Sequence, residues 1–353
     1  MSGLAAPALD DALMAPLPQF AGDELAAMLR EHFGISGSFA RISGERDLNL
    51  HVACADGQDF VFKVCGNSES VEELAFQNAA LTHLARTDPA LPVPRVVAAR
   101  DGSTIVAHES GGQRYLLRVL TYLPGEPVLG SKLSRVQRVE IGMLAARLDR
   151  ALADFEHPAA NRAFIWDLVH VTSLREKIAF LDTDQRKATA ARVLDRFTTT
   201  VGPLLPALPR QVVHNDLNQA NLLLRPQDGS VSGIIDFGDM IETIRVAEVA
   251  IASAHLLYRE ADPMSAMAQV VKGYARLLPL EANEIAVLPV LVQARLATRE
   301  LIVSWRRQAN PAATTSYRDD VSRFGWEALA RCDAVSLSET AERLAEAARL
   351  GGH

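Results

Sequence analysis

A short polar segment near residue 214 carries side chains that could take part in chemistry. It reads His-Asn-Asp-Leu-Asn-Gln-Ala-Asn over 214–221, and apolar residues flank it on both sides. A second apolar run further along the chain ends in Asp236-Phe-Gly. The Asp-Gly pair at 228–229 is a turn signal, so a hairpin is expected between the two runs. Asp216, Asn221 and Asp236 would then lie together at one end of that hairpin.

This set of side chains suits phosphoryl transfer. One carboxylate would orient an attacking hydroxyl and accept its proton, while an amide oxygen and a second carboxylate would hold Mg²⁺ against the phosphates. Each aspartate taken alone is also a common turn or cap residue. The agreement of spacing and flanking apolar strands in both segments favours the catalytic interpretation.

The composition is that of an ordinary globular protein. The chain has 353 residues, 48% of them hydrophobic and 22% charged, which allows two domains of usual size. A net charge of −7 argues against a nucleic-acid partner. No apolar run has the length of a membrane span, and the N-terminus lacks the basic start of a signal peptide. Three widely spaced cysteines indicate neither a disulfide framework nor a zinc site, so we expect a cytoplasmic protein without a membrane partner.

The elements that must position the polar residues change character near residues 124–125. Before this point, period-two patterns and turn signals dominate, with helices expected at 23–33 and 70–86. Strands are predicted at 38–43, 48–54, 59–64, 95–99, 104–108 and 114–123. After this point, helical spacing dominates. Helices are predicted at 134–155, 173–200, 245–258, 262–278, 283–307, 318–332 and 336–350.

The expected fold class is therefore α+β, with two lobes and a cleft between them. The smaller lobe is β-rich and the larger one is mainly helical. The predicted division is a leader at 1–22, an N-terminal nucleotide-binding lobe at 23–122 and a C-terminal catalytic and substrate-binding lobe at 123–353. The terminal helix is amphipathic and could pack on its own lobe or on a second subunit, so either a monomer or a homodimer is compatible with the sequence.

The motifs resemble those of the aminoglycoside phosphotransferase and choline kinase superfamily, over nearly the whole chain from about residue 37 to about 330. The resemblance implies a two-lobed, protein-kinase-like fold, a nucleoside triphosphate donor (ATP or GTP) and Mg²⁺. It implies that Asp216 is the catalytic base and that Asn221 and Asp236 are magnesium ligands. His214 belongs to the catalytic loop, and its expected role is to hold the shape of that loop by packing and hydrogen bonding.

The resemblance also requires a lysine for the α- and β-phosphates, and Lys63 is the candidate. It stands in an apolar strand, where an ammonium is costly unless it finds a partner. The hairpin before it lies where the family has its phosphate-covering loop, and the segment after 116 resembles the interlobe hinge, whose backbone would bind a purine. The further expected nucleotide-binding residues are Ser43, Asn49, Leu120, Tyr122 and Leu123.

The sequence departs from the family at the partner of this lysine. The family usually supplies a glutamate from the next helix, but Gln77 occupies that position here. Glu73 lies one turn earlier on the same helix face. Gln77 would hold Lys63 by a neutral hydrogen bond, which is weaker than the charge-assisted bond that Glu73 would supply. The sequence leaves both alternatives open.

The residue pattern is most similar to the hydroxylysine-kinase-like branch. The segments that carry this likeness are 43–49, 76–81, 166–168, 214–216 and 236–240. It implies a small hydroxylated amino acid or amine as acceptor. The alternatives are an aminoglycoside, homoserine, choline or ethanolamine acceptor, or a catalytically inactive kinase-like binding protein.

An amino-acid acceptor would need carboxylates for its ammonium group and a cation for its carboxylate. The helix expected at 283–307 carries several arginines, among them those at positions 295, 299 and 306. An aromatic side chain could stack against an ammonium group. The predicted substrate-binding residues are Asp239, Glu242, Trp166, Asp167 and Arg299.

Overall fold

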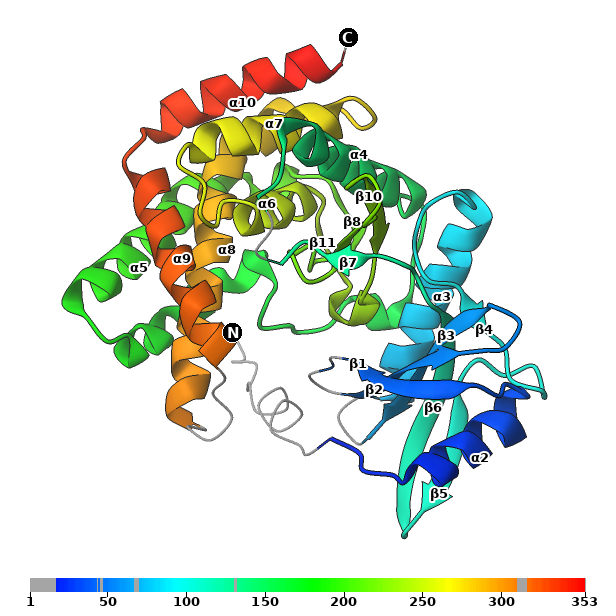
Figure 1. Ribbon diagram of the computed structural model, residues 1–353. Helices are drawn as coiled ribbons and strands as arrows, with labels where there is room; N and C mark the ends of the chain where they lie inside the picture. Colours follow the sequence, from blue (N-terminus) through cyan, green and yellow to red (C-terminus); the bar gives the residue numbers. More distant parts are fainter. Residues whose placement is uncertain are drawn as a thin grey trace. The chain divides into compact units, whose positions relative to one another are not determined.

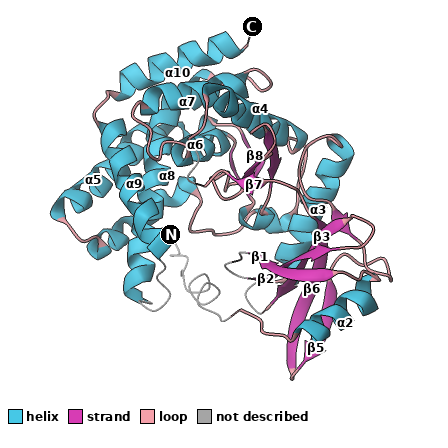
Figure 2. Ribbon diagram, in the orientation of Figure 1, coloured by secondary structure: helices cyan, strands magenta, loops and turns pink. Residues whose placement is uncertain are grey.

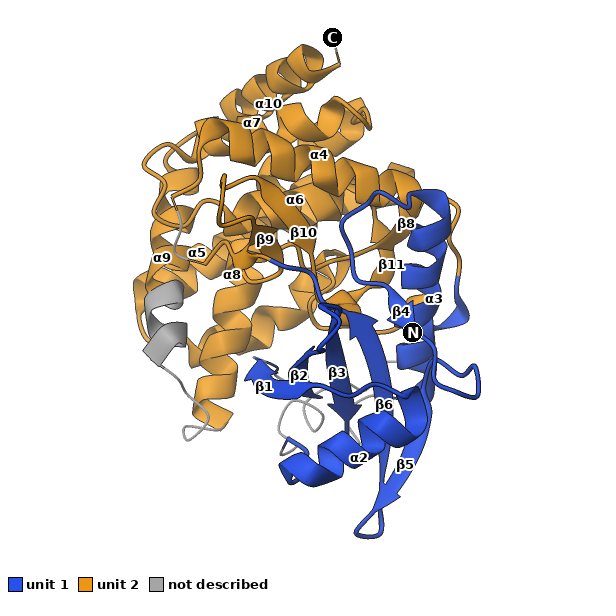
Figure 3. Ribbon diagram, turned by 45° about the vertical axis from the view of Figure 1, so that its right-hand side comes forward, with its two compact units in different colours: residues 1–124, 157–159 blue, residues 125–156, 160–353 orange. Residues whose placement is uncertain are grey.

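The computed structural model describes residues 17–42, 44, 47–66, 70–129, 132–309 and 316–352 (Figure 1). The chain forms two compact units (Figure 3). Unit 1 comprises residues 1–124 and 157–159, and unit 2 comprises residues 125–156 and 160–353. Most of the predicted leader, up to residue 16, lies outside the described residues.

Unit 1 is built on a six-stranded antiparallel sheet (Figure 2). The strand order is β1-β2-β3-β6-β4, and β5 pairs with β6. The elements are α2 (Gly22–Phe33), β1 (Ser38–Ile42), β2 (Asp47–Ala53), β3 (Asp59–Cys65), α3 (Val71–Thr87), β4 (Val96–Val97), β5 (Val106–Ser110) and β6 (Gln113–Thr121). These elements match the predicted ones within a few residues.

The two faces of this sheet differ in chemistry. Leu50, Phe62 and Val119 are neighbours across β2, β3 and β6, and they belong to a buried core that includes the apolar side of α2. Successive side chains of a strand point to opposite faces. Lys63 and Arg118, which oppose each other on β3 and β6, therefore lie on the other face. Arg118 donates hydrogen bonds to two amide side chains of α3, so α3 covers this polar face.

Unit 2 is mainly helical. Its helices are α4 (Arg135–Ala151), α5 (Asp184–Arg196), α6 (Val246–His255), α7 (Pro263–Ala275), α8 (Ala282–Ala309), α9 (Ser316–Asp333) and α10 (Leu337–Gly351). Two glycines bring α4 and α7 close together. A Cβ at Gly142 would lie 2.0 Å from the Val270 carbonyl oxygen, and one at Gly273 would lie 2.0 Å from the Val139 carbonyl oxygen. Within the described ranges, no helix combines the length and apolar character needed to cross a bilayer.

Two small sheets in unit 2 position the polar loops. The strands are β7 (Glu126–Pro127), β8 (Arg210–Val213), β9 (Leu222–Leu224), β10 (Val231–Ile234) and β11 (Ile241–Ile244), and β7 pairs with the outer side of β9. The predicted hairpin is the antiparallel pair β9–β10, and β8 pairs with β11, which the sequence reading did not predict. Loop 214–221 joins β8 to β9, and loop 235–240 joins β10 to β11. Both loops therefore connect the same two strand pairs.

The prediction of one helix over 173–200 is wrong. A 3₁₀ helix spans Leu168–Phe180, and α5 begins only at Asp184. Leu181 is extended between them, and the Thr183 hydroxyl accepts the Arg186 N–H as an N-cap. A threonine cap starts a new helix because it satisfies an N–H group that the first turn leaves free, and helical spacing alone does not reveal that restart.

Candidate active site

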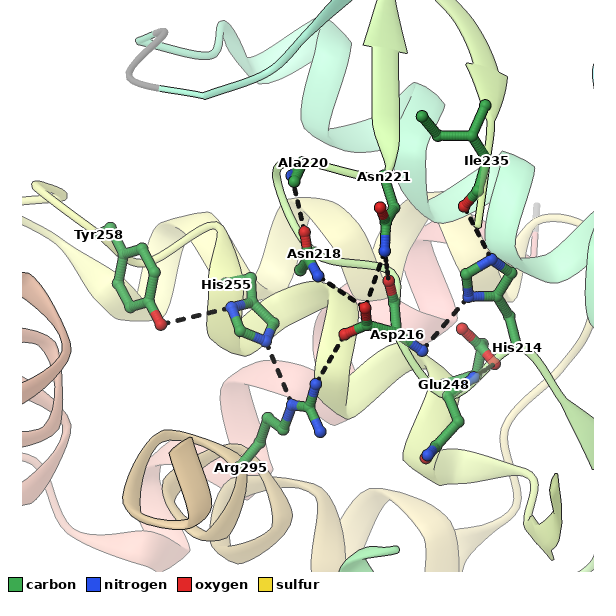
Figure 4. Close-up of polar contacts among 11 residues, drawn as sticks. His214, Asp216, Asn218, Ala220, Asn221, Ile235, Glu248, His255, Tyr258 and Arg295 are labelled. Atoms are coloured by element: carbon green, nitrogen blue, oxygen red, sulfur yellow. Dashed lines mark hydrogen bonds and ion pairs between the residues drawn. The ribbon is translucent and has the colours of Figure 1, made fainter. Parts of the chain in front are cut away.

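Asp216 lies at the centre of a polar network in unit 2 (Figure 4). Its Oδ2 accepts hydrogen bonds from Asn218 Nδ2 and Asn221 Nδ2, each at 2.8 Å. Its Oδ1 accepts from Arg295 Nη2, also at 2.8 Å, which makes an ion pair. Three side chains therefore fix the carboxylate, two from its own loop and one from α8.

The electrostatic surroundings of Asp216 act in both directions. Burial raises the pKa of its carboxyl group to about 8, and the nearby Asp239 and Asp236 add to this rise. The Arg295 guanidinium and the Asn218 hydrogen bond act against it. The net effect is a pKa near neutral pH, which suits a general base because such a group can both accept and release a proton.

His214 links the two polar loops. Its Nε2 lies 3.1 Å from the Ile235 carbonyl oxygen, and the Asp216 N–H donates to its Nδ1 at 3.3 Å. These partners assign the neutral tautomer with the proton on Nε2. Burial lowers the pKa of His214 to about 4, which agrees with a neutral ring. The geometry supports a structural role, since the ring joins the loop after β8 to the end of β10.

Glu248 of α6 accepts a backbone hydrogen bond from the residue that precedes Asp216. Asn215 has a φ of 65°, a left-handed conformation that is uncommon outside glycine. Its N–H donates to Glu248 Oε2 at 3.0 Å, and burial raises the pKa of Glu248 to about 7. Glu248 is not among the residues predicted for the site. The sequence feature that could have identified it is a carboxylate inside the apolar run 244–257, because buried carboxylates are rare without a partner.

Asn221 and Asp236 fit the predicted magnesium site in their chemistry. Asn221 commits its amide nitrogen to Asp216 and turns its oxygen away from that carboxylate (Figure 4). Asp236 has a left-handed φ of 65° and an exposed side chain. Oxygen donors suit Mg²⁺, which usually takes one or two carboxylates plus substrate phosphates. Among the described residues no three His, Cys, Asp or Glu side chains cluster as a metal cage.

The Arg295 guanidinium contacts three side chains, those of Asp216, Trp166 and His255. Its guanidinium lies 5.0 Å from the centre of the Trp166 ring, and its Nε donates to His255 Nε2 at 3.1 Å. Burial and the nearby arginines lower the pKa of His255, so the ring is neutral and can accept. The predicted substrate residue Trp166 thus lies beside the Asp216 partner. Arg295, which lies one helical turn before the predicted substrate residue Arg299, contacts Asp216.

The other predicted substrate residues have partners of their own. Asp167 is 4% exposed, caps the 3₁₀ helix and accepts the Thr243 hydroxyl at 2.8 Å. Burial raises its pKa. Glu242 is exposed on β11, 4.0 Å from Arg210. Arg299 pairs with Glu300 at 2.6 Å. Asp239 ends the short helix after Asp236 and acts electrostatically on Asp216.

In unit 1, Lys63 forms an ion pair that is not among the sequence-based predictions. Its Nζ lies 3.1 Å from Asp47 Oδ2 at the start of β2, and the two side chains are 14% and 4% exposed. Glu73 uses its carboxylate to accept the Ser70 N–H in a helix capping box. An ion pair between adjacent strands therefore neutralises the lysine charge within the sheet.

Gln77 contacts a different cation. Its side-chain oxygen accepts from Arg118 Nη2, and Arg118 Nη1 donates to Asn78 Oδ1 at 3.2 Å. Arg118 is 2% exposed and opposes Lys63 across β3 and β6. Arg118 belongs to the segment that resembles the hinge, and no role is predicted for it from the sequence. The structure shows that Arg118, together with these two amides, connects α3 to the sheet.

The predicted phosphate-loop and hinge residues are placed as follows. Ser43 lies outside the described residues, and Asn49 opposes Lys63 on β2. Leu120 is within β6, and Leu123 follows that strand. The Tyr122 N–H donates to the Asp59 carbonyl oxygen at 2.9 Å, so a base contact through Tyr122 would use its carbonyl.

Comparison with known proteins places these residues in a family context. The sequence profile described as the phosphotransferase enzyme family matches residues 39–283. Hydroxylysine kinase from Mus musculus is 29% identical over 337 residues, which cover 88% of this chain and 89% of that protein. Hydroxylysine kinase from Danio rerio is 27% identical over 346 residues, which cover 94% and 97%.

Solved structures share the fold. Amicoumacin kinase hAmiN, in complex with AMP-PNP, Ca²⁺ and Ami, aligns with a TM-score of 0.68 and 15% identity over 90% of this chain and 95% of that one. A microcompartment-associated aminopropanol kinase aligns with a TM-score of 0.68 and 20% identity over 93% and 99%. The predicted protein-kinase-like fold, with a β-sheet N-terminal region and a mainly helical remainder, is confirmed.

Proposed function

Because the chain belongs to the phosphotransferase enzyme family, we propose that it transfers the γ-phosphoryl group of a nucleoside triphosphate to a hydroxyl of a small hydroxylated amino acid. ATP or GTP is the donor, with Mg²⁺, and the acceptor is hydroxylysine-like. The matched region contains both Lys63 and Asp236.

The fixed carboxylate of Asp216 is the observation that carries this proposal. The acceptor hydroxyl oxygen attacks the γ-phosphorus, the bond from that phosphorus to the β-bridging oxygen breaks, and the nucleoside diphosphate leaves. Asp216 orients the hydroxyl and takes its proton. Phosphoryl transfer depends chiefly on positioning and electrostatic stabilisation, and a carboxylate held by Asn218, Asn221 and Arg295 meets that need.

The donor side of the proposal rests on Lys63 and on the two oxygen ligands. A lysine ammonium on the polar face of the sheet suits phosphate oxygens. Bound Mg²⁺ would neutralise charge that develops on the phosphates. Asn221 and Asp236 would hold it, because each presents an oxygen that hard cations prefer.

The acceptor class is supported by two relatives that cover most of both chains. They are named hydroxylysine kinase, and their identities of 29% and 27% extend over 88% and 94% of this chain. An acceptor of this class has a hydroxyl for Asp216 and charged groups for the surrounding side chains.

A panel of acceptors with two donors tests the proposal. Release of ADP and GDP is measured with purified protein and Mg²⁺ over hydroxylysine, homoserine, ethanolamine, choline and an aminoglycoside. Hydroxylysine-like amino acids are expected to give the highest kcat/KM, and mass spectrometry should show a phosphomonoester on the acceptor.

Asp216→Asn protein serves as the background for every acceptor. Phosphorylation of choline or an aminoglycoside in preference to the amino acids would overturn the acceptor class. Nucleotide binding without phosphorylation of any acceptor would point to a binding protein.

A further inference from the structure

The hydrogen bonds to Asp216 distinguish its two carboxylate oxygens. An ionised carboxylate offers about four lone-pair directions, two on each oxygen. On Oδ2 both are engaged, by Asn218 and Asn221 at 2.8 Å each. On Oδ1 one is engaged, by Arg295 at 2.8 Å. The Asp216 side chain is 18% exposed, so a ligand can still reach it.

We propose that Asp216 Oδ1 is the atom that receives the acceptor proton and that Arg295 is the positioning residue that presents it. This inference rests on the proposed function and specifies which atom of the base acts. The hydroxyl would donate to the second lone pair of Oδ1, while Arg295 Nη2 occupies the first. When the new O–P bond forms and the bond to the nucleoside diphosphate breaks, the hydroxyl proton moves to Oδ1.

Arg295 can hold this oxygen because its own position is constrained. The side chain is 3% exposed on α8, and its guanidinium carbon lies over the Trp166 ring, 5.0 Å from the ring centre. Its Nε donates to His255 Nε2, and Tyr258 lies 3.3 Å from the other ring nitrogen of His255. These contacts fix the direction of Nη2 and hence the rotation of the carboxylate.

Only an arginine meets the geometry of this position. The planar guanidinium makes one hydrogen bond to His255 from Nε and another to Asp216 from Nη2, while its carbon lies over the Trp166 ring. A lysine ammonium is a point charge without a planar face. Lysine at 295 would keep the charge near Asp216 but lose the contacts that orient it.

The test compares Arg295→Ala and Arg295→Lys with the wild type. Loss of carboxylate alignment should lower kcat about a hundredfold in Arg295→Ala, because a misplacement of about 1 Å has an effect of that size. Nucleotide affinity should stay unchanged, since Arg295 acts through Asp216. Guanidinium ion at millimolar concentration should restore part of kcat in Arg295→Ala, and Arg295→Lys should fall between that variant and the wild type.

Arg138→Ala is the matched control. Arg138 is 6% exposed and donates to Glu260 and Gln269, which belong to neither of the loops 214–221 and 235–240. Its loss should lower stability as Arg295→Ala does, while kcat stays near the wild-type value and does not respond to guanidinium. Circular dichroism shows whether each variant is folded.

Basal hydrolysis of the nucleotide is measured beside acceptor phosphorylation. If the wild-type protein phosphorylates no acceptor, the result counts against the proposed function. The role of Arg295 is then tested by the rates of nucleotide hydrolysis of the wild type, Arg295→Ala and Arg295→Lys. An Arg295→Ala protein with unchanged kcat and unchanged hydrolysis overturns the inference. A folded Arg295→Ala protein whose lowered rate does not respond to guanidinium also overturns it.

Discussion

Asp216 in unit 2 accepts hydrogen bonds from three side chains, and the loop that carries it is held by His214 and Glu248. Lys63 in unit 1 forms an ion pair with Asp47 and shares its sheet face with a second cation, Arg118. The first arrangement surrounds an anion with donors, and the second places two cations on one face of a sheet, one of them paired with Asp47.

This difference indicates different tasks for the two sites. Donors that are fixed before the reaction stabilise charge without reorganisation, so the network around Asp216 should act on turnover. Neighbouring cations on one face attract anions. The polar face around Lys63 should therefore act mainly on nucleotide affinity, and the following variants separate these two effects.

Asp216→Asn should have the largest effect on turnover. It keeps the shape of the side chain but removes the proton acceptor, so kcat should fall about 10³-fold while nucleotide affinity stays near the wild-type value. Steady-state kinetics and calorimetry measure the two quantities. Asp228→Asn, in the exposed hairpin turn, is the control. Near-normal turnover in Asp216→Asn would show that Asp216 is not the catalytic base.

Asp236→Asn should weaken the metal site. Losing the charged oxygen ligand is expected to raise the Mg²⁺ concentration for half-maximal activity roughly tenfold or more, because hard cations prefer carboxylates. A magnesium titration at saturating nucleotide measures this change, again with Asp228→Asn beside it. An unchanged magnesium requirement would place the metal ligands elsewhere.

Lys63→Met tests the other half of the comparison. Hydrogen bonds to charged groups contribute about 1.5–3 kcal/mol, so nucleotide binding should weaken about 10- to 100-fold. Turnover at saturating nucleotide should fall less than in Asp216→Asn. Asp47→Asn keeps the lysine and should not weaken nucleotide binding. A larger loss of kcat than of affinity in Lys63→Met would contradict the separate tasks.

Glu248 gives the smallest effect on activity and a measurable effect on stability. Glu248→Ala leaves backbone N–H groups without their acceptor and should lower the free energy of unfolding by about 1–3 kcal/mol. Glu248→Gln keeps an acceptor and should lose less. Urea unfolding of both variants measures the difference, and equal losses would show that the acceptor is not what holds the loop.

The same residue predicts a pH dependence. Burial raises the pKa of folded Glu248 from 4.5 to about 7, so the native state binds more protons than the unfolded state between these values. Its contribution to stability is present below pH 4.5 and decreases as pH rises through about 7. Glu248→Gln does not titrate, so its unfolding free energy should decline less over this interval.

The parts of the site that a sequence can predict are the local ones. Asp216, Asn218 and Asn221 lie within one loop, and the strands on either side fix how they meet. A local pattern therefore carries most of the information. The hairpin β9–β10 is predicted for the same reason, because an Asp-Gly turn between apolar runs determines its pairing.

Long-range partners were not predictable in this way. Arg295 and Glu248 come from helices 79 and 33 residues away from their partners Asp216 and Asn215. A charged residue in an apolar helix signals burial with a partner but not which partner. Likewise, helix spacing favours Gln77 and Glu73, but it does not predict the ion pair of Lys63 with Asp47, which lies two residues before Asn49, the residue opposite Lys63 on β2.

The cation–π contact between Arg295 and Trp166 also offers an optical reporter. The chain has three tryptophans, and each has a cation over its ring: Lys177 at Trp305, Arg186 at Trp326 and Arg295 at Trp166. Replacing Trp305 and Trp326 with phenylalanine would leave Trp166 as the only indole fluorophore. Its emission would then follow, without any attached label, how the acceptor and the nucleotide change the surroundings of the base.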